Sequence, residues 1–462
     1  MKSFLHTKSI GHPIGHHIQE DSSLRRCLTA TDLTMLGIGS IIGAGIFVLT
    51  GVAAATQAGP GIILSYLLAG LACSFAALCY AELASCFGGC GGAYSYAYAG
   101  IGEFFAWLVG WVLLLEYGMN VPTIAIGWSG YVHSALHAIG FILPHEFITD
   151  PFNGGIINIP AMLIIFLLAG VLSLGVKESA RFNELLVFIK LSVIAIFIGI
   201  GLFYFKVENW HPFLPFGVQG IVNGAGLIFF AFIGFDSVAA AAEETIDPQR
   251  NLPIGILASL LICTIIYILV AAILVGIVHY PHLNNASPVA AALIKVGHRV
   301  GAEIISIGAV AGLTTAILAM YYGFTRIFLA MSRDNLMPHF FAKVHEASQT
   351  PRRLIWTVAF FMAIIAGLFP ISHIASLVNM GTLAAFIAVC GTVLVLRITK
   401  PTLPRPFKAP WNPVVPVLGI ILCFYLMFSL SGFTWMGFGV WMAIGLMIYI
   451  VGKVIVLCKA TA

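Results

Sequence analysis

The chain has 462 residues and a formal net charge of +4, and 60% of its residues belong to the hydrophobic set AVILMFWYC. Charged residues make up only 9% of the chain, against about 25% in soluble domains. This composition excludes a soluble globular domain and indicates an all-α membrane protein, because a transmembrane helix needs about 20 mostly apolar residues. We expect a multi-pass protein of the cell membrane, with the lipid bilayer as its environment, no nucleic-acid partner and no enzymatic activity.

Apolar stretches bounded by turn residues or charges predict twelve transmembrane helices in one integral-membrane domain, residues 32–457. A polar tail, residues 1–31, precedes the first helix, and residues 458–462 form a short C-terminus. The connections are mostly short, so no separate soluble domain is expected. The predicted helices cover residues 32–55, 60–86, 101–132, 158–176, 182–205, 220–242, 252–278, 299–331, 354–369, 374–397, 412–431 and 434–457.

The distribution of basic residues predicts the orientation of the chain. With the N-terminus in the cytoplasm, the inward-facing segments carry 18 Lys and Arg residues, and the outward loops carry only three: Lys206, Lys295 and Arg299. This bias follows the positive-inside rule, so both termini are expected in the cytoplasm. One further basic residue, Lys190, falls inside a predicted helix.

Cysteine and histidine spacing predicts no metal site. Cys86 and Cys90 are the only close pair among nine cysteines, and no second pair or histidine cluster completes a zinc site. The N-terminal tail holds several histidines, for which we favour a polar tail over a metal-binding segment. They are His6, His12, His16 and His17.

Two predicted helices contain features that a plain membrane anchor avoids. The first holds a glycine cluster, residues 37–45 (GIGSIIGAG), and the sixth holds Gly234 and Asp236 near its middle. Such glycines can form a helix-packing face. Alternatively, both helices are discontinuous and lie at matching positions of two inverted halves, which is a sequence indication of a secondary-transporter binding site. The halves would be residues 32–205 and 220–397, in opposite orientations because each has five helices, followed by residues 412–457.

A break in a membrane helix favours a particular kind of ligand. Unwinding exposes backbone N–H and C=O groups that hydrocarbon cannot satisfy. The N-terminus of a half-helix carries about +0.5 charge and suits a carboxylate, whereas free carbonyls suit an ammonium group. A site with both is complementary to an α-amino acid. Glycines such as Gly43 and Gly45 allow close backbone approach there.

Three ionisable residues fall within predicted helices. Lys190 lies about 12 Å into the fifth helix, at 1.5 Å per residue. Its side chain either reaches back to the inner surface or places an ammonium where a sodium-driven carrier would hold a sodium ion, which makes it a candidate for proton coupling. Glu116 and Asp236 either bind a basic substrate side chain or pair with water and backbone.

Several ordered motifs resemble the cationic amino acid transporter family of the amino acid–polyamine–organocation superfamily, in its bacterial form. Residues 32–47 (DLTMLGIGSIIGAGIF) resemble the first helix of the superfamily. The sixth-to-seventh helix signature is carried by residues 234–237 (GFDS), 242–244 (AEE) and 248–253 (PQRNLP). Residues 179–183 (SARFN) and 332–334 (SRD) also match. The resemblance covers about residues 24 to 455 in the expected order.

The resemblance implies a leucine-transporter-type fold of five plus five inverted helices with two more at the C-terminus. It implies sodium-independent, proton-coupled amino acid transport by alternating access, with protons as the coupling ion and no other cofactor. The substrate carboxylate would meet the N–H groups of Ala44 and Gly45 beside Gly43; Ala44 replaces a hydroxyl residue common in the family. The ammonium would meet the carbonyls of three residues with a fourth beside them: Ile41, Phe230, Ile233 and, adjacent, Ala231.

The resemblance also assigns the side-chain pocket and the proton site. Glu116, Asp236, Tyr267 and Met320 would line the pocket, and Lys190 matches a basic residue of some bacterial relatives. The two carboxylates favour arginine, lysine or ornithine, whereas Met320 favours alanine-sized substrates, and the sequence does not rank them. A sensor or scaffold that binds an amino acid without transporting it is the alternative. The choice among uniport, symport and exchange, the oligomeric state and any small membrane subunit stay open.

Overall fold

The computed structural model describes residues 28–87, 92–138, 140–141, 143–174, 179–242, 245–285, 287–343, 345 and 350–461. Most of the predicted N-terminal tail, with its histidines, lies outside these residues. So do the glycine-rich residues 88–91, the paired glutamates 243–244 of the family motif, and Ala462.

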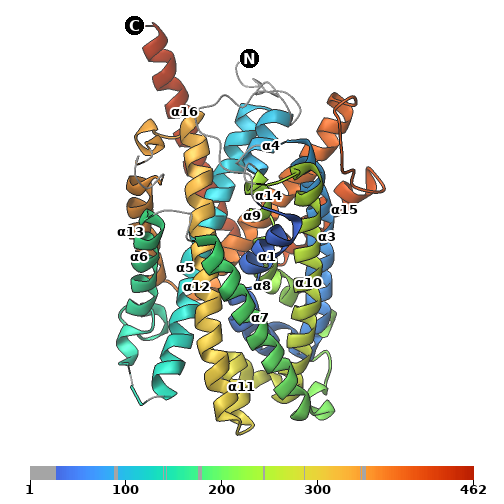
Figure 1. Ribbon diagram of the computed structural model, residues 1–462, viewed down its shortest axis with the longest axis vertical. Coiled ribbons are helices and arrows are strands. Elements are labelled where there is room, and N and C mark those ends of the chain that lie inside the picture. The colour runs from blue at the N-terminus through green and yellow to red at the C-terminus, as the bar shows by residue number, and fades with distance from the viewer. Residues whose placement is uncertain are drawn as a thin grey trace.

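Helices make up the regular structure of the described residues, together with two isolated β-bridges. The α-helices are α1 (Ala30–Ile41), α2 (Thr50–Ala53), α3 (Ile62–Cys86), α4 (Gly92–Gly100), α5 (Glu103–Ala138), α6 (Ile159–Leu174), α7 (Ser179–Phe203), α8 (Gly217–Ile228), α9 (Ser237–Ala240), α10 (Pro248–Ile277), α11 (Pro288–Lys295), α12 (Arg299–Arg333), α13 (Arg352–Leu368), α14 (Ile371–Thr399), α15 (Val414–Phe428) and α16 (Gly432–Thr461). The longest of them run roughly along the long axis of the molecule (Figure 1).

Short helical segments of other types connect or extend the α-helices. Two are π-helices, η1 (Gly45–Leu49) and η2 (Ala54–Ala58), on either side of α2. The 3₁₀ segments are η3 (Gly59–Gly61), η4 (His145–Phe147), η5 (Pro151–Asn153), η6 (Val207–Trp210), η7 (Phe229–Phe232), η9 (Tyr280–Leu283) and η10 (His339–Ala342).

Eight helical segments of the described chain are long and apolar enough to cross a membrane. They are Gly45–Cys86, Glu103–Leu136, Leu186–Phe203, Gly217–Ala239, Pro248–Ile277, Arg299–Arg333, Ile371–Thr399 and Gly432–Lys453, and α6 and α15 are shorter apolar helices. The predicted all-helical membrane architecture is therefore confirmed, whereas the number of twelve spans stays a prediction. Exposed apolar side chains such as Leu163, Phe188 and Met447 give outer faces that suit hydrocarbon.

The helix α5 lies at the centre of the packing. It contacts α12, α14, α4, α6, α13 and α16. Stacked indoles join it to α16: the Trp111 and Trp441 ring centroids are 4.5 Å apart, and each indole N–H donates to the backbone carbonyl of the other residue. Gly445 leaves the space for this stack, because a Cβ there would lie 2.4 Å from Trp111.

A buried ion cluster joins α3, the end of α14 and the segment that follows it. The Glu82 carboxylate on α3 is 1% exposed and accepts bonds from Arg397 on α14 at 3.0 and 2.5 Å. Arg405 Nε lies 3.4 Å from Glu82 Oε1, and the Ala409 N–H donates to Oε2 at 2.8 Å. This carboxylate therefore ties two helices and residues 400–409 together.

Candidate functional site

Two helices are interrupted, as the glycine pattern predicts. The helix α1 ends at Ile41, Ile42 is extended (φ −75°, ψ 97°), and helical structure resumes at Gly45. In the other helix η7 ends at Phe232, Ile233 is extended (φ −65°, ψ 133°), and α9 begins at Ser237. Gly234 has φ 124°, a conformation that residues with a Cβ rarely adopt. We call these segments, together with the residues that flank them, the two breaks: residues 39–45 and 230–237.

The two breaks lie against each other. A Cβ on Gly45 would lie 2.2 Å from the Ala231 Cα, and a Cβ on Gly234 would lie 2.8 Å from the Ser40 carbonyl carbon. Backbone therefore meets backbone at both glycines. The alternative role of these glycines, helix packing, also occurs, since a Cβ on Gly37 would collide with Ser259 on α10. Glycines of one cluster thus serve helix packing at one end and the break at the other.

Tyr267 on α10 connects the two breaks. Its hydroxyl lies 2.8 Å from the carbonyl oxygen of Ile41 and 2.8 Å from that of Ala231, and it can donate to either. The side chain is fully buried among apolar neighbours, including Tyr66 at 5.5 Å between ring centroids. The hydroxyl thus satisfies backbone acceptors that the interruption releases. Tyr267 contacts backbone here, which adds to the pocket-lining role that the resemblance implies.

Lys190 on α7 points into the first break. Its amine donates to the carbonyl oxygens of Gly39 at 2.7 Å and Ile42 at 2.9 Å, and the residue is fully buried. The side chain does not reach an exposed surface, so the alternative that it reaches back to the inner surface of the membrane is wrong. An amine on a neighbouring helix therefore donates to two carbonyls of the interrupted helix.

Carboxylates approach the second break from two elements. Asp236 belongs to the break itself and Glu116 lies on α5; both are buried. The Tyr117 hydroxyl on α5 donates to Asp236 Oδ2 at 2.6 Å. Among the described residues, Asp236 Oδ1 and both carboxyl oxygens of Glu116 have no hydrogen-bond partner. These are buried acceptors that suit water or a polar ligand group.

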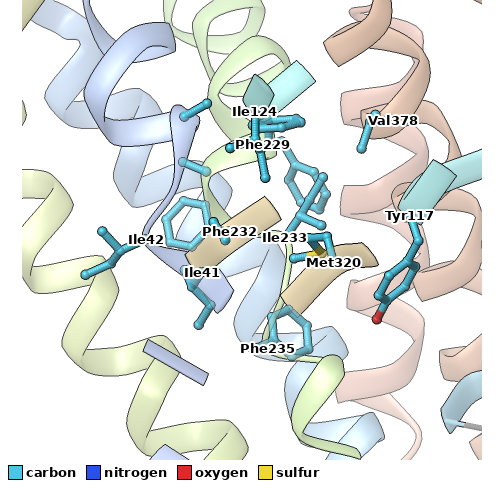
Figure 2. Close-up of a cluster of buried hydrophobic side chains, with 14 of the residues drawn as sticks. Ile41, Ile42, Tyr117, Ile124, Phe229, Phe232, Ile233, Phe235, Met320 and Val378 are labelled. Atoms are coloured by element: carbon cyan, nitrogen blue, oxygen red, sulfur yellow. The ribbon is translucent and has the colours of Figure 1, made fainter. Parts of the chain in front are cut away.

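An apolar cluster surrounds the breaks. Ile124 on α5, Ile233, Met320 on α12 and Val378 on α14 belong to it and are shown with Phe229 and Tyr117 in Figure 2. Met320 lies close to the second break, because a Cβ on Gly234 would be 2.9 Å from the methionine methyl. Apolar side chains therefore dominate the surroundings of the breaks, and the carboxylates are exceptions.

All twelve residues predicted for the site are buried, at the breaks or on helices packed against them. They are Ile41, Gly43, Ala44, Gly45, Glu116, Lys190, Phe230, Ala231, Ile233, Asp236, Tyr267 and Met320. Of the carbonyls expected to bind an ammonium, that of Ile41 accepts from Tyr267 and that of Phe230 accepts from the Ile233 N–H at 3.3 Å. No group of three metal-ligating side chains occurs in the described chain.

Two residues that hold parts of the site in place are not identified by the sequence analysis. Tyr117 holds Asp236, and Asn379 on α14 donates its amide to the carbonyls of Gly226 and Leu227 at 2.8 and 3.1 Å, just before the second break. A buried asparagine in an apolar helix is a usable signal, because unpaired polar groups are costly in hydrocarbon. A tyrosine in such a helix gives no comparable signal.

Interrupted membrane helices that meet at a buried site are typical of the class of secondary transporters. Residues 28–452 match the amino acid permease family, and the chain belongs to that family. It is similar to the branched-chain amino acid permease BcaP of Bacillus subtilis (strain 168), at 46% identity over 436 residues and 93% of each chain. It is equally similar, at 46% over 432 residues, to the methylthioribose transporter of the same organism, covering 93% of this chain and 94% of that one.

A more distant relative is the cationic amino acid transporter 4, vacuolar, of Arabidopsis thaliana. It is 36% identical over 397 residues, which is 84% of this chain and 66% of the relative. Family and relatives confirm the resemblance to an amino acid–polyamine–organocation permease of the cell membrane. They also confirm that the chain is a transporter and not an enzyme.

Proposed function

We propose that this chain is a secondary active transporter that moves L-amino acids across the cell membrane by alternating access. The observation that carries the proposal is the meeting of the two breaks, with Gly45 packed on Ala231. Membership in the amino acid permease family supports it. The proposal includes a twelve-span leucine-transporter-type fold with residues 32–205 and 220–397 as inverted repeats, residues 412–457 as two further helices, and cytoplasmic termini.

The substrate backbone binds between the breaks. Its carboxylate meets the N–H groups of Ala44 and Gly45, where helical structure resumes and the first N–H groups have no intrahelical acceptor. Its ammonium meets carbonyls around Ile41 and Ile233. At Ile41 it replaces the hydrogen bond that the carbonyl accepts from the Tyr267 hydroxyl. Water and protein donors satisfy these groups when the substrate leaves.

The side-chain pocket favours neutral, apolar substrates over cationic ones. Ile124, Ile233, Met320 and Val378 form apolar walls, and the similarity to a branched-chain amino acid permease points the same way. Alanine-sized and branched substrates therefore rank ahead of arginine, lysine and ornithine. Methylthioribose is a second candidate, because a relative of equal identity is named for it and a thioether suits apolar walls. It lacks the charged groups of an amino acid, however.

Transport is proton-coupled through Lys190 and independent of sodium. The protonated amine holds the carbonyls of Gly39 and Ile42. Loss of the proton removes the charge that holds this part of the break, and the break can then rearrange. Proton movement is thus linked to the helix that binds the substrate.

Flux measurements in proteoliposomes test the proposed function. Purified protein should accumulate labelled leucine or alanine when the outside is made acidic, without sodium, and a panel of amino acids and methylthioribose should compete. Binding without flux would instead indicate the sensor or scaffold. Uptake that requires sodium, or competition by methylthioribose alone, would contradict the proposal.

A further inference from the structure

Tyr117 occupies an unusual position between three elements. It lies on α5 next to Glu116, and its hydroxyl donates to Asp236 Oδ2 in the second break at 2.6 Å. Its ring lies over Gly323 on α12, where a Cβ would be 2.5 Å from the ring carbon Cε1. The glycine therefore makes room for the ring, and the ring directs the hydroxyl at the carboxylate.

This hydrogen bond changes what Asp236 can offer to a substrate. One carboxylate oxygen is engaged by Tyr117, and the other has no partner among the described residues. A guanidinium group binds a carboxylate best through both oxygens at once. A guanidinium that approaches both oxygens has to share Oδ2 with the Tyr117 hydroxyl, which also holds the carboxylate in one orientation, and the aromatic ring adds to the apolar groups on this side. Asp236 is thereby less available to a cationic substrate, although it lies at the second break.

We propose that Tyr117 is a specificity-determining residue, which keeps the pocket selective for neutral side chains by holding Asp236 away from cationic substrates. The inference rests on the proposed function. It accounts for Asp236 at the second break, where the surrounding side chains other than Glu116 are mainly apolar. Tyr117 acts through Asp236 and is a positioning residue. Its removal should extend the substrate range and leave recognition of the amino acid backbone intact.

The conservative change Tyr117→Phe tests this directly, because the ring stays over Gly323 and only the hydroxyl is lost. In proteoliposomes, the arginine concentration that halves uptake of labelled leucine should fall at least about tenfold, the size of one hydrogen bond to a charged group. Alanine should compete as it does in the wild type. In the double variant Tyr117→Phe, Asp236→Asn, arginine should compete no better than in the wild type.

The matched control is Tyr321→Phe on α12, another buried tyrosine whose hydroxyl donates to a backbone carbonyl, that of Ile355. It should leave competition by arginine unchanged. The inference is overturned if Tyr117→Phe leaves arginine competition at the wild-type value, if alanine competition rises equally, or if the gain persists in the double variant. Wild-type protein that takes up no amino acid would instead overturn the proposed function and, with it, this inference.

Discussion

Lys190 gives the first prediction at the scale of single residues. Changing it to alanine removes the donor to the Gly39 and Ile42 carbonyls and leaves two buried acceptors unpaired. Uptake of labelled leucine should then no longer respond to an imposed inward proton gradient, while binding stays measurable. Exchange of internal for external substrate at equal pH separates a loss of proton coupling from a loss of substrate binding. The control is Lys295→Ala, an exposed lysine on α11. If external acid accelerated leucine uptake by Lys190→Ala as much as uptake by the wild type, the coupling role would be contradicted.

Single residues also show what the sequence could and could not predict. Lys190, Glu116 and Asp236 are recognisable because ionisable side chains inside apolar helices are rare and costly. Their partners are not recognisable in the same way. Tyr117 reaches Asp236 across 119 positions of the chain, and only the packing of α5 on the second break creates that pair. Residue type therefore predicted the charged groups of the site, and tertiary structure was needed to pair them.

The two breaks carry the prediction at the scale of elements. In Gly45→Val the added Cβ would lie 2.2 Å from the Ala231 Cα. The broken helices must therefore separate. We expect loss of substrate binding and a lower thermal midpoint, with a destabilisation of about 1–3 kcal/mol or more for overpacking. Gly199→Val on α7 is the control, since nothing lies within 4 Å of a Cβ there. Unchanged binding in Gly45→Val would show that the close approach is not required.

Long helices were easier to predict than short ones. The predicted ranges overlap the observed long helices, since stretches of span length leave a strong hydropathy signal. The helices α4 and α11 are absent from the prediction because nine and eight residues are too short for that signal. Glycines located the breaks, but not the π-helical segments η1 and η2 that follow the first break. Those depend on the neighbours that the interrupted helix contacts.

At the scale of the whole molecule, the ion cluster at Glu82 joins two groups of helices. The helix α3 packs on α10 and α8, which follow the second break or lead to it, and α14 packs on α5 and also directly on α3. Glu82, Arg397 and Arg405 connect α3 to α14 through one buried carboxylate. Hydropathy places Glu82 at a helix end, but its two arginine partners come from residues more than 300 positions away.

Glu82→Gln should weaken that connection. It leaves two arginines without their counter-charge, and removing one partner of a buried pair costs about 3–5 kcal/mol, less where a partner such as Arg397 is partly exposed. The thermal midpoint in detergent should fall clearly below that of Glu303→Gln, whose carboxylate on α12 is exposed. Because the breaks lie elsewhere, leucine affinity per folded molecule should stay close to that of the wild type. Equal midpoints in the two variants would mean that the cluster does not hold the helix groups together, and a large loss of affinity with an unchanged midpoint would place Glu82 in the substrate site instead.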